Sequence, residues 1–148
     1  MTGVQTCALP ISYIISFTIL RSGTLIDQTT ISDAISAIDG AVSPKPLCYM
    51  ANCVHPTVLY DALAQPFNQN SLVKTRFLGI QGNTSPLSYE ELDRSVNLLS
   101  SNPRAFARDT LRLRSEMHLK IFGGCCGTDD RHIEEIAKGL SKEFSKNS

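Results

Sequence analysis

Short apolar runs recur along the chain at a spacing that suits alternating strands and helices, and the first of them is rich in β-branched and aromatic residues. Runs of this length and composition are typical of buried strands, because branched and flat side chains pack well on a pleated surface. The predicted strands are Tyr13–Ile19, Leu47–Asn52, Thr75–Gln81 and Leu119–Phe122.

After each of these runs the apolar residues follow a helical period instead. Ile31, Ala34, Ile35 and Ile38 fall at i, i+3, i+4 and i+7, and Gly40 ends this first pattern. The same reasoning predicts a helix opened by His55-Pro56-Thr57 and ended by Pro66, a helical turn over Ser88–Leu92, a helix started by Asn102-Pro103 and a last helix capped by Thr128. The residues predicted to face the core are Val58, Leu59, Ala62 and Leu63; then Phe106, Thr110, Leu113 and Met117; then Ile133, Ile136, Ala137, Leu140 and Phe144.

Strands that alternate with helices predict an α/β fold with a parallel sheet. In such sheets, open or closed, ligands bind at the carboxyl ends of the strands. Cys53 follows the second predicted strand, and Cys125-Cys126 follow the fourth. We therefore expect these thiols to meet at one edge of the sheet, as a metal site built from separate elements.

The segment Ile121–Thr128, Ile-Phe-Gly-Gly-Cys-Cys-Gly-Thr, carries the strongest local signal. Neighbouring side chains on a regular strand point to opposite faces, so two adjacent thiols converge only where the strand bends. Gly123, Gly124 and Gly127 flank the pair, and glycine adopts backbone conformations that other residues avoid. A soft metal ion, with zinc the first candidate, fits such a pair.

Other interpretations of this cysteine pair stay open: a buried pair of free thiols, a strained vicinal disulfide, or a glycine-rich loop that binds phosphate at a helix start. The lysine of a P-loop is absent, and a purely structural pair has no need of flanking glycines. A dithiol redox module would favour Cys-x-x-Cys, which the chain lacks. Cys48 is expected to be a small core residue. The position of His55, two residues after Cys53, is compatible with a metal ligand, a partner of a ligand or a loop histidine, and we favour a local structural role.

Composition narrows the class of protein. A chain of 148 residues is long enough for one modest domain with a core. Its 14 basic residues balance its 14 acidic ones, so charge gives no case for binding nucleic acid or an anionic membrane. The chain has no membrane-length apolar stretch and no convincing secretory signal, and its five cysteines include an adjacent pair, which is unusual for a disulfide framework. We expect a cytoplasmic protein.

Residues 1–11, Met-Thr-Gly-Val-Gln-Thr-Cys-Ala-Leu-Pro-Ile, resemble the translation of a sequencing-library adapter joined to a gene fragment. A genuine short N-terminal tail is the alternative. Because of the resemblance we treat 1–11 as a non-native segment and 12–148 as the domain. On this interpretation Cys7 carries no functional information, and the natural protein begins further upstream.

Several motifs occur in the order found in homocysteine S-methyltransferases. They are Ser16-Phe17-Thr18, Asn52-Cys53, Asn83-Thr84-Ser85 and the segment Gly123–Thr128, and the similarity covers essentially Ser12–Leu140. That family folds as a (β/α)8 TIM barrel, and this chain resembles its C-terminal half, strands five to eight. The resemblance implies that the first four βα units, with an Asp-Gly motif that helps to hold the substrate, lie outside this chain.

The resemblance also implies a zinc ion (Zn²⁺) held by Cys53, Cys125 and Cys126, with the sulfur of homocysteine at an open fourth position. Methyl transfer to that sulfur would give methionine, with S-methylmethionine, S-adenosylmethionine, betaine or a methylfolate route through cobalamin as methyl donor. Asn52 is a weaker candidate for orienting Cys53 or the substrate, since asparagine at a strand end is often only a turn former. The alternative is a non-catalytic zinc-binding or thiol module. The oligomeric state cannot be predicted from the sequence.

Overall fold

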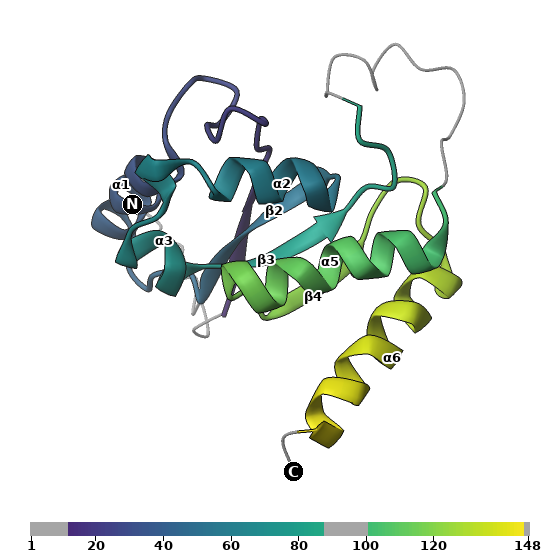
Figure 1. The fold of residues 1–148 in the computed structure, drawn as a ribbon. Helices are drawn as coiled ribbons and strands as arrows, with labels where there is room; N and C mark the ends of the chain where they lie inside the picture. The colour runs from purple at the N-terminus through teal and green to yellow at the C-terminus, as the bar shows by residue number, and fades with distance from the viewer. Residues whose placement is uncertain (1–11, 88–100, 147–148) are drawn as a thin grey trace, which may run out of the picture.

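The protein is a parallel α/β structure. A computed structural model describes residues 12–87 and 101–146, so the helical turn expected at Ser88–Leu92 lies outside the described residues. In that part of the chain four parallel strands pair in the order β1-β2-β3-β4, which confirms the predicted parallel sheet (Figure 1). The strands are β1 (Ile14–Phe17), β2 (Cys48–Val54), β3 (Phe77–Gly82) and β4 (Ile121–Gly124).

Helices connect and follow the strands. Their bounds are α1 (Ile31–Ala41), α2 (Pro56–Leu63), α3 (Ser71–Arg76), α5 (Pro103–Met117) and α6 (Asp130–Lys146), with a 3₁₀ turn η1 (Pro66–Asn68) after α2. Figure 1 shows α2 and α5 lying along the sheet, while α6 extends away from it at the carboxyl end of the chain. In the described part of the chain, no helix has the length and apolarity needed to cross a membrane.

The main core lies between the sheet and helices α1, α2, α3 and α5. Tyr49, Phe77 and Ile80 contribute fully or nearly fully buried side chains from the strands. The predicted apolar faces of the first three long helices are confirmed, because all their members are buried or packed against the core. These members are Ile31, Ala34, Ile35, Ile38, Val58, Leu59, Ala62, Leu63, Phe106, Thr110, Leu113 and Met117.

The third strand begins later than predicted, because a short helix precedes it. Thr75 and Arg76, expected in the strand, belong to α3. The side chain of Asn70 accepts a hydrogen bond from the amide of Val73 at 3.0 Å and so caps this helix. Val73 is buried, which fixes the helix against the core. A helix of six residues is too short to give a clear periodic signal.

The last helix is capped and oriented differently from the prediction. Asp129, and not Thr128, precedes α6, and its carboxylate accepts a hydrogen bond from the amide of Arg131 at 3.1 Å. Ile133 and Ala137, predicted to face the core, are exposed, whereas His132 and Ile136 are buried. The buried stripe therefore starts at a histidine, which the pattern counted as polar. Leu140 packs against a second, smaller cluster formed by Phe106, Ala107 and Ile136 between α5 and α6. The side chain of Phe144 lies outside the described residues.

An ion pair braces the amino ends of the strands. Arg76 donates two hydrogen bonds to the carboxylate of Asp39, at 2.8 and 3.0 Å, and further ones to the carbonyl oxygens of Pro46 and Leu47. The hydroxyl of Tyr49 donates to the same carboxylate at 2.8 Å. The hydrogen bond from Arg76, followed by that from Tyr49, holds the pKa of Asp39 below its ordinary value.

This brace predicts a pH dependence of stability. Because the pKa of Asp39 is depressed on folding, its contribution is fully present above the unfolded value of about 3.9 and is lost as the pH falls through the folded value. Asp39→Asn should cost about 1–3 kcal/mol at pH 7, with the difference from wild type shrinking below about pH 4. Urea unfolding at several pH values measures this. Asp61→Asn, at a solvent-exposed pair with Arg21, is the control and should cost under about 1 kcal/mol.

Candidate metal centre

Cys53 lies at a bulge near the carboxyl end of β2. Asn52 pairs with Gln81 and Val54 pairs with Gly82, so Cys53 is an extra residue on its strand. Its φ of 50° is in the left-handed region, which non-glycine residues seldom occupy. The bulge breaks the alternation of the strand and so changes the direction of the Cys53 side chain.

Cys125 and Cys126 follow directly after β4, in the turn that leads to α6. The amide of Cys125 donates to the carbonyl oxygen of Gly82 at 2.7 Å, and the amide of Thr84 donates to the carbonyl oxygen of Cys126 at 3.2 Å. Gly127, with φ of 78°, permits the turn, as expected for a glycine after the pair. The last residue of β3 and the loop after it therefore each bond to one of the two cysteines.

The glycines before the pair serve a different purpose from the one predicted. Neither Gly123 nor Gly124 has a positive φ. A Cβ at Gly124 would lie 2.2 Å from Oγ1 and 2.8 Å from Cβ of Thr128, so this position has no room for a side chain. The hydroxyl of Thr128 in turn donates to the carbonyl oxygen of Cys125 at 2.6 Å. Gly124 thus allows the close approach that closes the cysteine turn.

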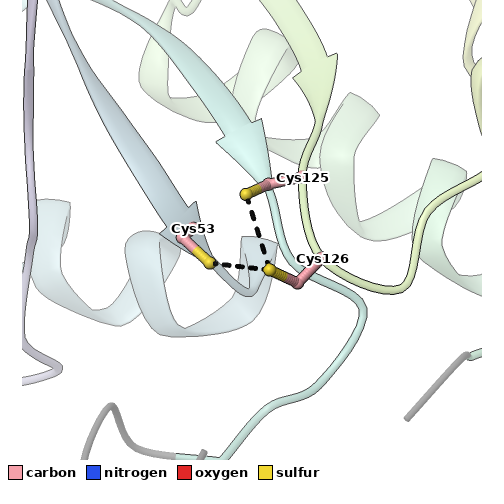
Figure 2. Close-up of side chains that lie close together, drawn as sticks. All are labelled: Cys53, Cys125 and Cys126. Atoms are coloured by element: carbon pink, nitrogen blue, oxygen red, sulfur yellow. Dashed lines mark hydrogen bonds between the residues drawn. The ribbon is translucent and has the colours of Figure 1, made fainter. Parts of the chain in front are cut away.

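The three sulfur atoms come together as the sequence predicts (Figure 2). Sγ of Cys126 lies 3.6 Å from that of Cys53 and 3.9 Å from that of Cys125, and all three sulfurs lie within 4.8 Å of one another. Tetrahedral ligands at a zinc–sulfur distance of about 2.3 Å are about 3.8 Å apart. The spacing of the thiols therefore fits one soft metal ion.

The surroundings argue against the other interpretations of the cysteine pair. All three cysteines are free thiols, so there is no vicinal disulfide. Cys126 is exposed, which does not fit a buried pair. The carboxylate of Asp129 occupies the start of α6, where a phosphate group would bind. Burial, and next the neighbouring thiols, raise the pKa of Cys53 to about 12, so without a cation this thiol keeps its proton at neutral pH.

Asn83 is a part of the site to which sequence reasoning gave no role. Its side chain is 2% exposed, and Nδ2 donates to Sγ of Cys53 at 3.7 Å. Its Oδ1 accepts from the amide of Ser85 at 2.9 Å, and its own amide donates to the carbonyl oxygen of Val54. The position directly after β3, at the carboxyl edge of the sheet, was the available signal.

The structure gives different positions to the three remaining residues considered in the sequence, His55, Cys48 and Asn52. His55 is the N-cap of α2, where Nδ1 accepts from the amide of Thr57 at 3.2 Å, so its predicted structural role is confirmed. Cys48 is buried within β2 and belongs to the core, as predicted. Asn52 is half-buried beside Cys53, and its proposed orienting role stays a prediction.

Comparison with known proteins gives one family. The model of the homocysteine S-methyltransferase family matches residues 2–140, whereas no curated protein was found to match the chain. The matched range extends into residues 1–11, and the assignment of those residues as non-native stays a prediction. Because the family match covers nearly the whole sequence, the chain belongs to the homocysteine S-methyltransferase family.

Proposed function

We propose that the chain is part of an enzyme that transfers a methyl group to the thiol of homocysteine, giving methionine, and that it holds a zinc ion through Cys53, Cys125 and Cys126. The observation that carries the proposal is the convergence of three thiols at tetrahedral spacing, from β2 and from the turn after β4. Family membership supports the reaction class.

The chemistry follows from the ligand set. A zinc ion held by Cys53, Cys125 and Cys126 would offer an open position at which a substrate thiol would lose its proton. In the proposed reaction the substrate sulfur would form the new bond to the methyl carbon, while the bond from the methyl carbon to the donor would break and its electron pair would leave with the donor. The thiol proton goes to solvent. Asn83 Nδ2 donates to Cys53 and so orients one ligand.

The fold supports a division of the active site between two halves. Within the described residues, β1 and β4 each have one edge without a strand partner. We propose that this sheet is strands five to eight of a (β/α)8 barrel, an architecture that typically takes about 250 residues. The first half would then supply contacts to the amino acid and to the small-molecule donor. Alignment of donor and acceptor at about 3–3.5 Å governs the rate, so the missing contacts matter for turnover.

The first consequence is that the zinc-loaded chain alone should not form methionine from homocysteine with any of the candidate donors. Mixing it with the first four βα units of a complete family member should restore zinc-dependent methionine formation, because the two halves together close the site. Methionine is quantified by chromatography after incubation with each donor. Turnover by the chain alone, at the level of a complete enzyme, would contradict the divided site.

The matched control for this assay is Cys126→Ala in the same mixture, which should abolish turnover. A mixture in which both halves fold and zinc is bound, but no methionine forms with any donor, would favour the non-catalytic zinc or thiol module instead.

A further inference from the structure

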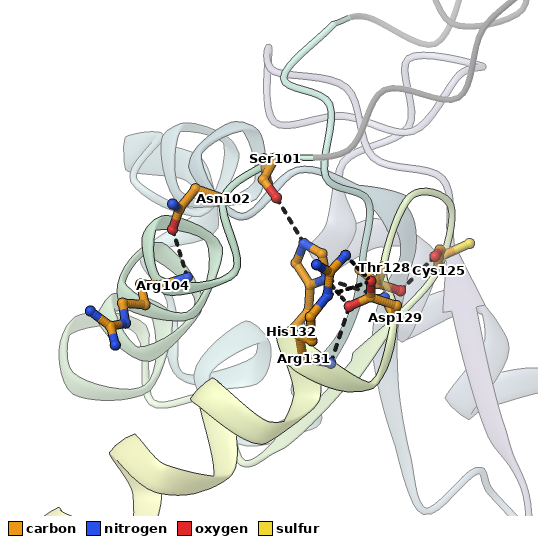
Figure 3. Close-up of polar contacts among 8 residues, drawn as sticks. All are labelled: Ser101, Asn102, Arg104, Cys125, Thr128, Asp129, Arg131 and His132. Atoms are coloured by element: carbon orange, nitrogen blue, oxygen red, sulfur yellow. Dashed lines mark hydrogen bonds and ion pairs between the residues drawn. The ribbon is translucent and has the colours of Figure 1, made fainter.

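One histidine near the thiols is fully enclosed, although no ligand role falls to it. His132, in the first turn of α6, is 0% exposed. Its Nδ1 lies 2.8 Å from Oδ1 of Asp129 and 3.2 Å from the amide nitrogen of the same residue, and its Nε2 lies 3.0 Å from the carbonyl oxygen of Ser101 (Figure 3). A carbonyl oxygen only accepts, so Nε2 carries a proton and donates.

The imidazole ring also belongs to a row of three rings. Phe106 meets His132 edge-on, with centroids 5.5 Å apart and an angle of 83° between the planes. On its other side Phe106 meets His55, with centroids 6.3 Å apart at 71°. Edge-to-face contacts of this kind add directional preference to the packing. The row therefore runs from the start of α2, through α5, to the start of α6.

Both cysteine-bearing connections are attached to this row. His55 comes two residues after Cys53, and Asp129 comes three residues after Cys126. Phe106 packs so tightly on β3 that a Cβ at Gly82 would lie 2.6 Å from its Cζ. Gly82 is the residue whose carbonyl oxygen accepts from the amide of Cys125.

We infer that His132 is the positioning residue of the three-thiol centre: its Nδ1 accepts a hydrogen bond from the amide of Asp129 and its Nε2 donates one to the carbonyl oxygen of Ser101, so it holds the cysteine turn against the start of α5. The inference rests on the proposed function only for the identity of the ion. Asp129 is otherwise anchored by Arg131, a residue of its own helix, so His132 provides the bond that reaches a different element.

The alternative is that His132 only contributes to general stability, and suitable variants separate the two. His132→Phe keeps a flat buried ring but leaves the carbonyl oxygen of Ser101 without its donor. His132→Gln can place an amide N–H toward Ser101 and an amide oxygen toward the amide of Asp129. Val73→Ala removes two buried methyl groups from α3, the short helix before β3. This variant is the control for an effect that comes from lowered stability and not from the cysteine turn.

The first readout is zinc affinity, measured by competition with a chelator, together with the thiolate-to-cobalt absorption of the cobalt-substituted protein. His132→Phe should bind zinc about 10- to 100-fold more weakly than wild type and shift the cobalt spectrum. His132→Gln should recover most of the affinity. Val73→Ala should stay within about twofold of wild type, because the site is remote from it.

The second readout needs no metal. In the metal-free protein, the amides of Cys125 and Thr84 donate across the cysteine turn, so their hydrogen exchange reports its order. These two amides should exchange faster in His132→Phe than in Val73→Ala. Equal exchange in the two variants, or zinc affinity in His132→Phe no lower than in Val73→Ala, would overturn the inference.

The two proposals fail in different ways. If the wild-type protein bound no zinc, the proposed function would be wrong. The exchange comparison would still decide whether His132 positions the turn.

Discussion

Replacing Cys126 with alanine is expected to have the largest effect on metal binding. Its sulfur lies 3.6 Å from that of Cys53 and 3.9 Å from that of Cys125, so it is close to both of the other proposed ligands. Structural zinc sites with four ligands have binding free energies of about 10–16 kcal/mol, which is about 3 kcal/mol per ligand. Loss of one ligand in Cys126→Ala should therefore weaken zinc binding about a hundredfold. Chelator competition, with zinc counted per folded chain, measures the change.

Cys48→Ala is the matched control for this experiment. Cys48 lies on the same strand as Cys53 but is buried in the core and takes no part in the thiol cluster. The variant should lose some stability and keep its zinc affinity. If Cys48→Ala and Cys126→Ala lowered the affinity equally, the loss would come from general destabilisation, and the assignment of Cys126 as a ligand would be wrong.

The second large effect is expected for Gly124→Ala. The added methyl would meet Oγ1 and Cβ of Thr128 at 2.2 and 2.8 Å, and the second of these atoms is close to the backbone. Thr128 must therefore move, which breaks its hydrogen bond to the carbonyl oxygen of Cys125. We expect a loss of about 1–3 kcal/mol in the free energy of unfolding, and about tenfold weaker zinc binding.

The neighbouring glycine provides the comparison. A Cβ at Gly123 would have its nearest contacts at 3.8 Å to the carbonyl oxygen of Ile80 and 3.9 Å to Cγ of Gln81, which are ordinary distances. Gly123→Ala should therefore leave stability within about 1 kcal/mol of wild type, since glycine is itself a poor strand residue. A larger loss for Gly123→Ala than for Gly124→Ala would contradict the role assigned to the approach of Thr128.

The common edge at which the thiols lie was predictable because it follows from sheet topology. Strands that alternate with helices run parallel, and residues at their carboxyl ends share an edge. Cys53 and the Cys125-Cys126 pair are therefore neighbours in space, although Cys53 and Cys126 are 73 positions apart in the chain. The long amphipathic helices were also predictable, because their apolar residues repeat over several turns.

Features that depend on a specific tertiary contact were not predictable. The bulge at Cys53 arises from pairing with β3, and no local signal marks a non-glycine residue for a positive φ. His132 was counted as polar, because only its partners Asp129 and Ser101 make its burial favourable. The cap of α6 also depends on a tertiary contact. The hydroxyl of Thr128 donates to the carbonyl oxygen of Cys125, and Asp129 caps the helix instead.

The central claim is that Cys53, Cys125 and Cys126 bind one zinc ion and leave a position for a substrate sulfur. Zinc-edge X-ray absorption of the zinc-loaded chain, before and after adding excess homocysteine, tests it most directly. We expect a shell of about three sulfurs at about 2.3 Å with one lighter atom, and about four sulfurs after homocysteine is added, while homoserine causes no change. A first shell made mostly of nitrogen or oxygen, or a four-sulfur shell before any thiol is added, would contradict the claim.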